Sequence, residues 1–165
     1  MPALMLLRHA KSDWSAEYGA DRERPLNKRG VRSAREVGRF VADYGLVPDL
    51  VLTSPAVRAA GTVQEAAAAG GWKTRIVTVS GLYGADPSYV LHVIRRVEDT
   101  RRLLVVGHEP TMSGFLERMS GSYLRVPTGT LASLIVRSTR WADIGWDTGE
   151  LELFVRPRLL TKRKG

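Results

Sequence analysis

Short apolar runs alternate with longer amphipathic segments along most of the chain. Six of the short runs predict strands, at residues 3–7, 49–53, 75–79, 102–106, 131–136 and 151–155. A short apolar run between turn signals is typical of a strand that is buried on both faces. The last two strands are expected to be antiparallel or to lie at the edge of the sheet.

The longer segments carry apolar residues at helical spacing, which predicts four helices at about 28–44, 55–70, 87–96 and 110–120. Asn27, Ser54 and Asp86 precede three of these segments. Each of these residue types is favoured as an N-cap, because its side chain accepts a hydrogen bond from the first helical turn. Segment 141–146, which begins and ends with tryptophan, predicts a loop.

The alternation of strands and helices favours a mainly parallel α/β sheet sandwiched between helices, with late edge strands. A chain of 165 residues has the size of one domain, so we expect a single domain over residues 1–165 with a basic tail at about 157–165. In such sheets, ligands bind at the carboxyl ends of the parallel strands. The pattern therefore indicates where to look for functional residues.

The composition favours a soluble cytoplasmic protein. The chain has no cysteine, which excludes disulfides, thiolate nucleophiles and cysteine-based metal sites. The apolar run at 3–7 is too short to span a bilayer, so no membrane association is expected. The net charge of +8 is compatible with nucleic-acid binding, but arginine is scattered along the chain rather than gathered in one stripe. We therefore do not expect nucleic acid as a partner.

Histidine and arginine gather at three of the predicted strand ends. Arg8 and His9 follow the first strand, Arg58 lies one turn into the helix after the second, and His108 follows the fourth. Because the carboxyl ends of parallel strands share one edge of a sheet, these side chains are expected to converge on a single pocket.

The expected cluster suits the chemistry of phosphate. Arginine presents a planar fork of donors that matches phosphate oxygens. A histidine among cations is held neutral, because like charges oppose its protonation, and a neutral imidazole has a lone pair that can attack phosphorus. A second histidine can hydrogen-bond to a phosphoryl oxygen and stabilise charge in the transition state.

The same residues resemble a known family, the histidine phosphatase superfamily. Leu7-Arg8-His9-Ala10 resembles its Arg-His-Gly signature, residues 54–59 match its Ser-Pro-x-x-Arg-Ala element, and residues 107–110 match its second histidine motif. Residues 21–30 are similar to the segment after the nucleophile in the SixA-type phosphohistidine phosphatases. The resemblance covers about residues 3–120 in the same order, and it is the ordered set that is specific.

The resemblance implies a phosphoglycerate-mutase-like fold and a role for each matching residue. It makes His9 the nucleophile that accepts the phosphoryl group. It places Arg8, Arg58 and His108 around the phosphate, and it makes Arg24 a further anion ligand. It implies no metal ion.

The chain departs from the family pattern in several places. Ala10 stands where most members have glycine, and Gly61 stands where glutamine is common. The chain also lacks a large lid insertion. An open pocket admits a phosphohistidine carried on a protein, and the basic surface favours an acidic phosphorylated partner.

The family's proton donor also has no obvious counterpart. Larger members place a glutamate after the third strand, where residues 81–85 of this chain contain no carboxylate. Asp86, Asp21 and Glu109 remain as candidate acids. Protonated phosphoimidazole leaves as neutral imidazole and needs little further help, so a pocket without a strong acid suits phosphohistidine.

We therefore expect a metal-independent, monomeric phosphatase that uses no cofactor and hydrolyses phosphohistidine on a protein. The first alternative is a phosphatase for a small phosphomonoester metabolite, acting at the same pocket. The second alternative is a phosphate- or nucleic-acid-binding module without catalysis. Salt-dependent binding to DNA or RNA without turnover would indicate the second alternative.

Overall fold

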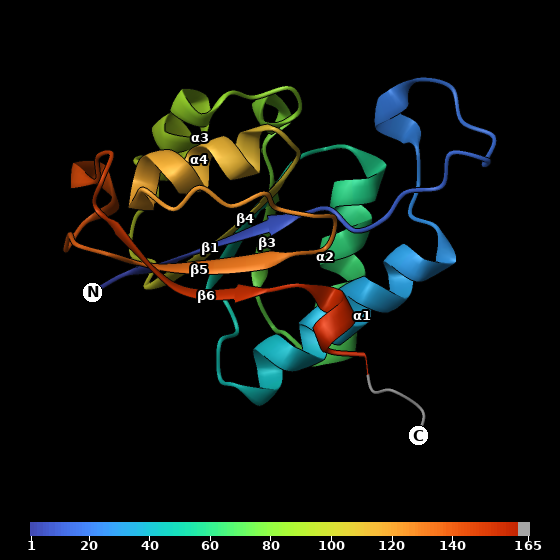
Figure 1. Ribbon diagram of the computed structural model, residues 1–165, viewed down its shortest axis with the longest axis horizontal. Helices are drawn as coiled ribbons and strands as arrows, with labels where there is room; N and C mark the ends of the chain where they lie inside the picture. The colour runs from blue at the N-terminus through green and yellow to red at the C-terminus, as the bar shows by residue number, and fades with distance from the viewer. Residues whose placement is uncertain (162–165) are drawn as a thin grey trace.

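The computed structural model describes residues 1–161, in which a six-stranded sheet is covered by helices on both faces (Figure 1). The strands are β1 (Ala3–Arg8), β2 (Leu50–Thr53), β3 (Arg75–Thr78), β4 (Arg102–Gly107), β5 (Leu131–Val136) and β6 (Gly149–Val155). Their order across the sheet is β3-β2-β4-β1-β5-β6. Strands β1 to β4 run parallel, and β5 is antiparallel to both of its neighbours.

The predicted α/β class and its mainly parallel sheet are thus confirmed. The two late strands are antiparallel or at the edge, as expected: β5 and β6 are antiparallel, β6 forms the edge, and β5 lies inside the sheet between β1 and β6. The burial of β5 on both sides explains its nearly unbroken apolar sequence.

Two helices cover each face of the sheet. The helices are α1 (Lys28–Asp43), α2 (Val57–Gly70), α3 (Pro87–Ile94) and α4 (Thr111–Ser120). Helices α1 and α2 lie on one face, and α3 and α4 lie on the other (Figure 1). The chain therefore leaves the adjacent strands β1 and β4 toward opposite faces, which creates a crevice at their carboxyl ends.

Two of the three predicted N-caps are confirmed. Asn27 accepts a hydrogen bond from the Gly30 N–H at 2.8 Å, and Asp86 accepts one from the Tyr89 N–H at 2.8 Å. The prediction for Ser54 was wrong, because α2 begins two residues later than expected, after Ala56. The predicted end of α3 at residue 96 was also wrong, because the helix stops at Ile94.

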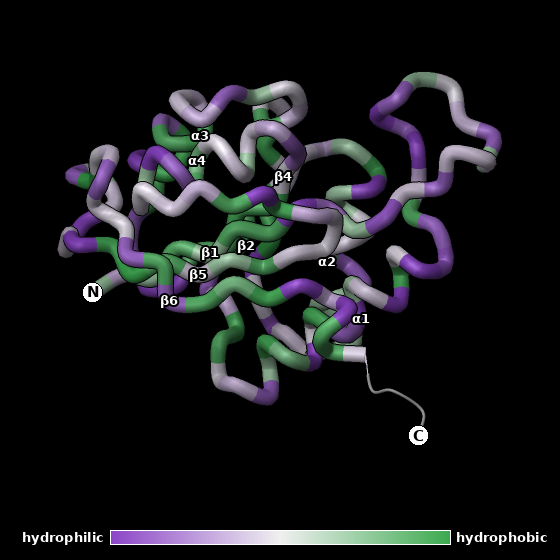
Figure 2. The backbone as a smooth tube through the Cα atoms, viewed as in Figure 1, coloured by the Kyte–Doolittle hydropathy of each residue, from purple (hydrophilic) through white to green (hydrophobic). Residues whose placement is uncertain are grey.

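The core consists of two layers, one on each side of the sheet. The hydrophobic strands of the sheet run through the centre of the molecule in Figure 2. Leu4 and Leu6 of β1 face α3 and α4, whereas Met5 and Leu7 of the same strand face α1 and α2. This division follows from the two-residue period of a strand, which points successive side chains to opposite faces. Both layers hold β1 in place, and β1 leads directly into His9.

The remaining predicted segments have defined places. The predicted loop 141–146 begins with a 3-10 helix, and its buried Trp141 donates from Nε1 to the Thr100 carbonyl at 2.7 Å. Of the predicted basic tail at about 157–165, Pro157–Leu159 forms a 3-10 helix beside α1, and residues 162–165 lie outside the described residues. Within residues 1–161, no helix is both long and apolar enough to cross a membrane.

Candidate active site

The structure brings Arg8, His9, Arg58 and His108 together at the carboxyl ends of β1, β2 and β4. The register pairs Arg8 of β1 with Gly107 of β4, and the His9 N–H donates to the Gly107 carbonyl at 3.0 Å. The ring centroids of His9 and His108 are 5.2 Å apart. Arg58, which lies in the first turn of α2, acts on the pKa values of both histidines through its charge. The convergence expected from the sequence is therefore present.

The His9 ring is held in one tautomer. Its Nδ1 lies 2.8 Å from the Ala10 carbonyl oxygen, and a carbonyl oxygen can only accept a hydrogen bond. Nδ1 therefore carries the proton, and the lone pair of neutral His9 resides on Nε2. With 7% of its surface exposed, His9 is almost fully buried.

Burial and neighbouring cations keep both histidines neutral. Burial is the main cause that lowers the pKa of His9 to about 3, and the charges of His108, Arg58 and Arg8 lower it further. Burial also lowers the pKa of His108 to about 4, and here Arg58 is the strongest neighbouring charge. Both imidazoles are therefore unprotonated at neutral pH, as the cluster of cations predicted.

The loop that carries His9 is fastened to α2. The Ala10 N–H donates to the Thr62 hydroxyl at 2.9 Å, and that hydroxyl donates to the Arg58 carbonyl at 2.7 Å. Ala10, which stands where glycine is common, is fully buried, so its methyl group is accommodated inside the fold. Thr62 thus ties the position of His9 to the turn of α2 that presents Arg58.

Arg58 is engaged by Asp21. Its guanidinium donates to the Asp21 main-chain carbonyl at 2.8 Å and to the Asp21 carboxylate at 3.0 Å. Tyr83 donates its hydroxyl to the same carboxylate at 2.8 Å. This hydrogen bond from Tyr83, together with those from Arg24 and Arg58, holds the pKa of Asp21 far below its usual range. Asp21 is therefore ionised and orients Arg58 at the pocket.

Ser54 contacts the second histidine of the site and does not cap α2. Its hydroxyl oxygen accepts from the Ala56 N–H at 3.2 Å and shares a hydrogen bond of 2.8 Å with Nε2 of His108. Ser54 is fully buried at the end of β2, so it fixes the orientation of the second histidine. The sequence pattern assigned Ser54 to capping because serine before proline is a common helix start, and the contact with a residue far along the chain left no local signal.

Arg8 and Arg24 occupy different parts of the site. Arg8 donates to the Val126 carbonyl at 3.1 Å, so the segment before β5 passes along the pocket. Arg24 is buried, donates to the Ser12 hydroxyl at 2.9 Å and forms a salt bridge with Asp21. Its Cζ atom lies 3.6 Å from the centroid of the Trp14 ring. The structure therefore brings Arg24 to the edge of the site, where its Nε and one Nη1 donor are already engaged by Ser12 and Asp21.

Three buried polar atoms of the site have no hydrogen-bond partner within residues 1–161. They are Nε of Arg8, Nε of Arg58 and Nδ1 of His108. Buried polar groups are rarely left unsatisfied, and exceptions concentrate at functional sites. The unused hydrogen-bonding capacity is suited to the oxygens of an anion.

The other two candidate acids have structural partners. Asp86 caps α3, and Glu109 accepts from the Ser113 N–H at 2.8 Å and contacts the Ser113 hydroxyl. Glu109 thus satisfies a donor at the start of α4, where a carboxylate also interacts favourably with the helix dipole.

The crevice between β1 and β4 is lined by two neutral histidines, the buried Arg58 and the half-buried Arg8, an arrangement suited to binding an anion such as phosphate. A family model described as the histidine phosphatase superfamily (branch 1) matches residues 4–83. An uncharacterized protein of Mycobacterium tuberculosis is 37% identical over 164 residues, covering 92% of this chain and 100% of that protein.

Two solved structures resemble the chain over nearly its whole length. A protein from Agrobacterium tumefaciens that was assigned as the phosphohistidine phosphatase SixA is 33% identical, with a TM-score of 0.81 and coverage of 95% of this chain and 99% of that one. One from Nakamurella multipartitia with the same assignment is 28% identical, with a TM-score of 0.80 and coverage of 94% and 96%.

The chain belongs to the histidine phosphatase superfamily, and its structural neighbours are SixA-like. The phosphoglycerate-mutase-like fold implied by the sequence resemblance is confirmed. These relationships support a phosphatase with a histidine nucleophile.

Proposed function

We propose that this protein hydrolyses phosphohistidine on a protein substrate through a phosphorylated intermediate on His9. The observation that carries the proposal is the tautomer of His9, whose Nδ1–H donates to the Ala10 carbonyl while Nε2 keeps its lone pair in a pocket shared with the charges of Arg8 and Arg58. A nucleophile that is neutral, buried and oriented by a backbone acceptor is ready for attack at neutral pH.

In the first step, Nε2 of His9 forms a bond to phosphorus while the P–N bond of the substrate breaks. The bonding electron pair goes to the leaving nitrogen of the substrate imidazole, which departs neutral because its other ring nitrogen carries a proton. Arg8, Arg58 and His108 bind the phosphoryl oxygens and stabilise the charge that they carry in the transition state.

In the second step, water attacks phosphorus and the bond to Nε2 of His9 breaks. The water oxygen becomes the fourth oxygen of inorganic phosphate, its displaced proton passes to phosphate or solvent, and His9 returns to the neutral form. The low pKa of His9 favours this recovery, because the free ring has no tendency to hold a second proton.

The engagement of all three candidate acids supports a substrate with a good leaving group. Asp86 caps α3, Glu109 accepts from the Ser113 N–H in the first turn of α4, and Asp21 is ionised in its contacts with Arg58 and Tyr83. An ionised carboxylate cannot donate a proton to an alkoxide. A phosphoramidate that leaves as neutral imidazole has no need of such a donor.

Exposed apolar side chains near the site support a protein as the carrier of the phosphoryl group. Trp14, on the loop after His9, is 73% exposed and stacks on Arg24. Tyr123, three residues before the Val126 carbonyl that binds Arg8, is 87% exposed. Aromatic residues and arginine are enriched where proteins bind one another.

A substrate panel tests the proposal. The full chain is assayed on a phosphohistidine protein, on aryl phosphates and on sugar phosphates, each with and without a chelator. We expect turnover of the phosphohistidine protein that the chelator leaves unchanged. Preference for a sugar phosphate would favour the small-phosphomonoester alternative, and loss of activity with chelator would contradict metal independence.

A trapping experiment tests the role of His9. After brief incubation with labelled substrate, the wild type is expected to carry acid-labile phosphate, whereas His9→Ala carries none and has no measurable turnover. The thermal melting of His9→Ala confirms that it is folded. Turnover near the wild-type rate in this variant would exclude His9 as the nucleophile.

A further inference from the structure

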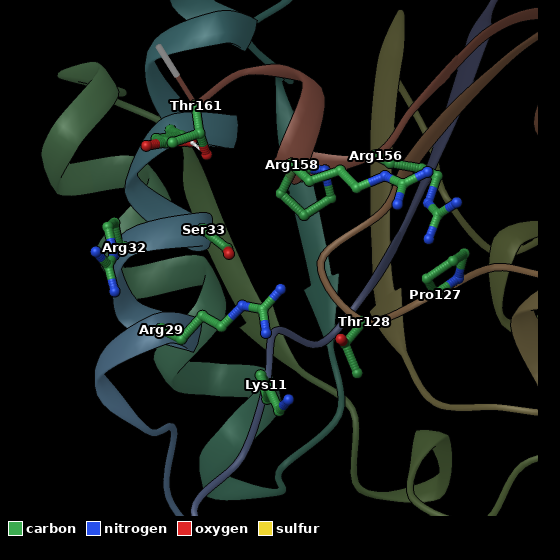
Figure 3. Close-up of a pocket in the computed structure, with 11 residues that line it drawn as sticks. Lys11, Arg29, Arg32, Ser33, Pro127, Thr128, Arg156, Arg158 and Thr161 are labelled. Atoms are coloured by element: carbon green, nitrogen blue, oxygen red, sulfur yellow. Dashed lines mark hydrogen bonds between the residues drawn. The ribbon is translucent and has the colours of Figure 1, made fainter. Parts of the chain in front are cut away.

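A second concave site lies beside the candidate active site, between the N-terminal half of α1 and the chain after β6 (Figure 3). It has a volume of about 500 Å³, within the range of about 300–1,000 Å³ that is typical of small-molecule sites. His9, Arg58 and His108 are not among its lining residues.

The charge of this pocket is strongly positive. It is lined by five cationic side chains, Lys11, Arg29, Arg32, Arg156 and Arg158, against one carboxylate, Glu36. Within residues 1–161, no salt bridge involves any of the five cations. Elsewhere in the protein, buried arginines such as Arg24 and Arg58 are paired with Asp21. The pocket therefore concentrates positive charge that the described part of the chain leaves uncompensated.

The single carboxylate does not neutralise the cluster. Glu36 accepts a hydrogen bond from the Thr161 hydroxyl at 2.9 Å. The arginines come from separate elements, with Arg29 on α1 and Arg156 directly after β6. Like charges held at such a concave surface repel one another and make the local electrostatic potential more positive, which attracts an anion.

Main-chain contacts join the wall of the pocket to the loop that carries His9. Gly129, next to the lining residue Thr128, donates its N–H to the carbonyls of Arg8 and His9 at 3.1 and 3.0 Å. A Cβ on Gly129 would lie 3.1 Å from Pro157, another lining residue, and 3.9 Å from the Cα of Ala10. The floor of the pocket is therefore contiguous with the backbone beside the active site.

We propose that this pocket is a second anion site, which binds a compact polyanion carrying two or more phosphoryl groups. A chain of two or three phosphoryl groups offers negative charge comparable to the net excess of four positive charges in the pocket. A single phosphate would leave part of the cluster uncompensated. The lining includes two prolines, Pro127 and Pro157, and contains no aromatic side chain on which a nucleobase could stack.

The concave shape of the pocket favours a compact polyanion over an acidic peptide. A peptide segment spreads its carboxylates over an extended surface, whereas the cations here converge on one cavity. Arginine also matches phosphoryl oxygens with two donors at once. The pocket lies outside the catalytic cluster, so its ligand is independent of the phosphorylated substrate that the enzyme uses.

Isothermal titration calorimetry with inorganic tripolyphosphate at low ionic strength tests the proposal on the full chain. We expect one equivalent to bind, with an affinity that falls as salt is added. Arg29→Gln and Arg156→Gln are each expected to weaken binding by about tenfold or more, because each removes a charge-assisted contact. The matched control is Arg39→Gln, an exposed arginine on the same helix outside the pocket, which should bind as the wild type does.

A catalytic-site variant separates the two anion sites. Arg58→Ala is expected to retain tripolyphosphate binding, and loss of binding in this variant would overturn the proposal by locating the ligand at the catalytic cluster. The absence of binding heat up to millimolar tripolyphosphate would also overturn it. So would equal weakening by Arg29→Gln and Arg39→Gln, or binding of a short poly-glutamate peptide in place of tripolyphosphate. Thermal melting of each variant confirms that the fold is intact.

Discussion

Replacing His9 with asparagine tests the claim that the imidazole is buried in its neutral form. Asparagine keeps a polar group that can donate to the Ala10 carbonyl, as Nδ1 does at 2.8 Å. It cannot take up a proton at mildly acidic pH. The variant therefore removes one titrating group while preserving the local hydrogen bond.

The expected effect follows from the difference in pKa between the folded and unfolded chains. Burial and nearby cations lower the pKa of folded His9 to about 3, against about 6.5 for an unfolded histidine. Because the folded value is the lower one, the stability contribution is complete above about pH 6.5 and is lost as the pH falls toward 3. Between about pH 7 and pH 4.5, the wild type should lose about 2.5 kcal/mol more unfolding free energy than His9→Asn.

Urea unfolding of both proteins at the two pH values measures this difference. His108 titrates in both proteins, so its contribution largely cancels in the comparison. An NMR titration of the His9 ring provides an independent reading, and the ring's own protonation midpoint should lie near pH 3 rather than near 6.5. Equal losses of stability in the two proteins would refute the argument for a buried neutral imidazole.

Three further predictions concern the site and its supports. Arg58→Ala should lower kcat/KM by about 100-fold or more. Arg58→Lys should remain at least about tenfold below wild type, because an ammonium group cannot make the bidentate hydrogen bonds of a guanidinium. Full rescue by lysine in steady-state kinetics would exclude a bidentate contact. Gly30→Ala should cost about 2 kcal/mol or more in urea unfolding, because its Cβ would lie 2.0 Å from the Lys11 carbonyl oxygen. The matched Gly61→Ala, whose nearest contact is 3.5 Å away, should gain about 0.5–1 kcal/mol, and equal effects would contradict the packing argument. Asp86→Asn and Glu109→Gln should each leave kcat/KM for phosphohistidine within about threefold of wild type, whereas selective loss on alkyl phosphates would reveal a general acid.

Much of the fold was predictable because its signals are local. A strand such as β1 is recognised by a short apolar run, and a cap such as Asn27 or Asp86 by its place before a helical pattern. The positions of Arg8, His9, Arg58 and His108 followed from the same reasoning, since parallel strands present their carboxyl ends at one edge. The ordered motifs then identified the superfamily to which the chain belongs.

The sequence did not reveal the partners of these residues. Asp21 contacts Arg58 across 37 positions, Ser54 contacts His108 across 54, and Arg8 reaches Val126 across 118. The start of α2 differs from the predicted one for a related reason. Ser54 lies at the end of β2 and is hydrogen-bonded to His108, and the helix begins after Ala56.

By itself, the sequence determined the α/β class, the parallel strands and the residues that meet at their carboxyl ends. The spacing of apolar residues and the capping of helices involve residues that are close in sequence, so the sequence pattern predicts them. Only the tertiary structure decided the tautomer of His9, the ionised state of Asp21 and the assembly of the cationic pocket around Arg29 and Arg156. The ionised state of Asp21 and the cationic pocket depend on how loops and helices from distant parts of the chain pack together. The His9 tautomer rests on a hydrogen bond to the adjacent Ala10 carbonyl, whose geometry is set by the folded backbone and not by the residue pattern.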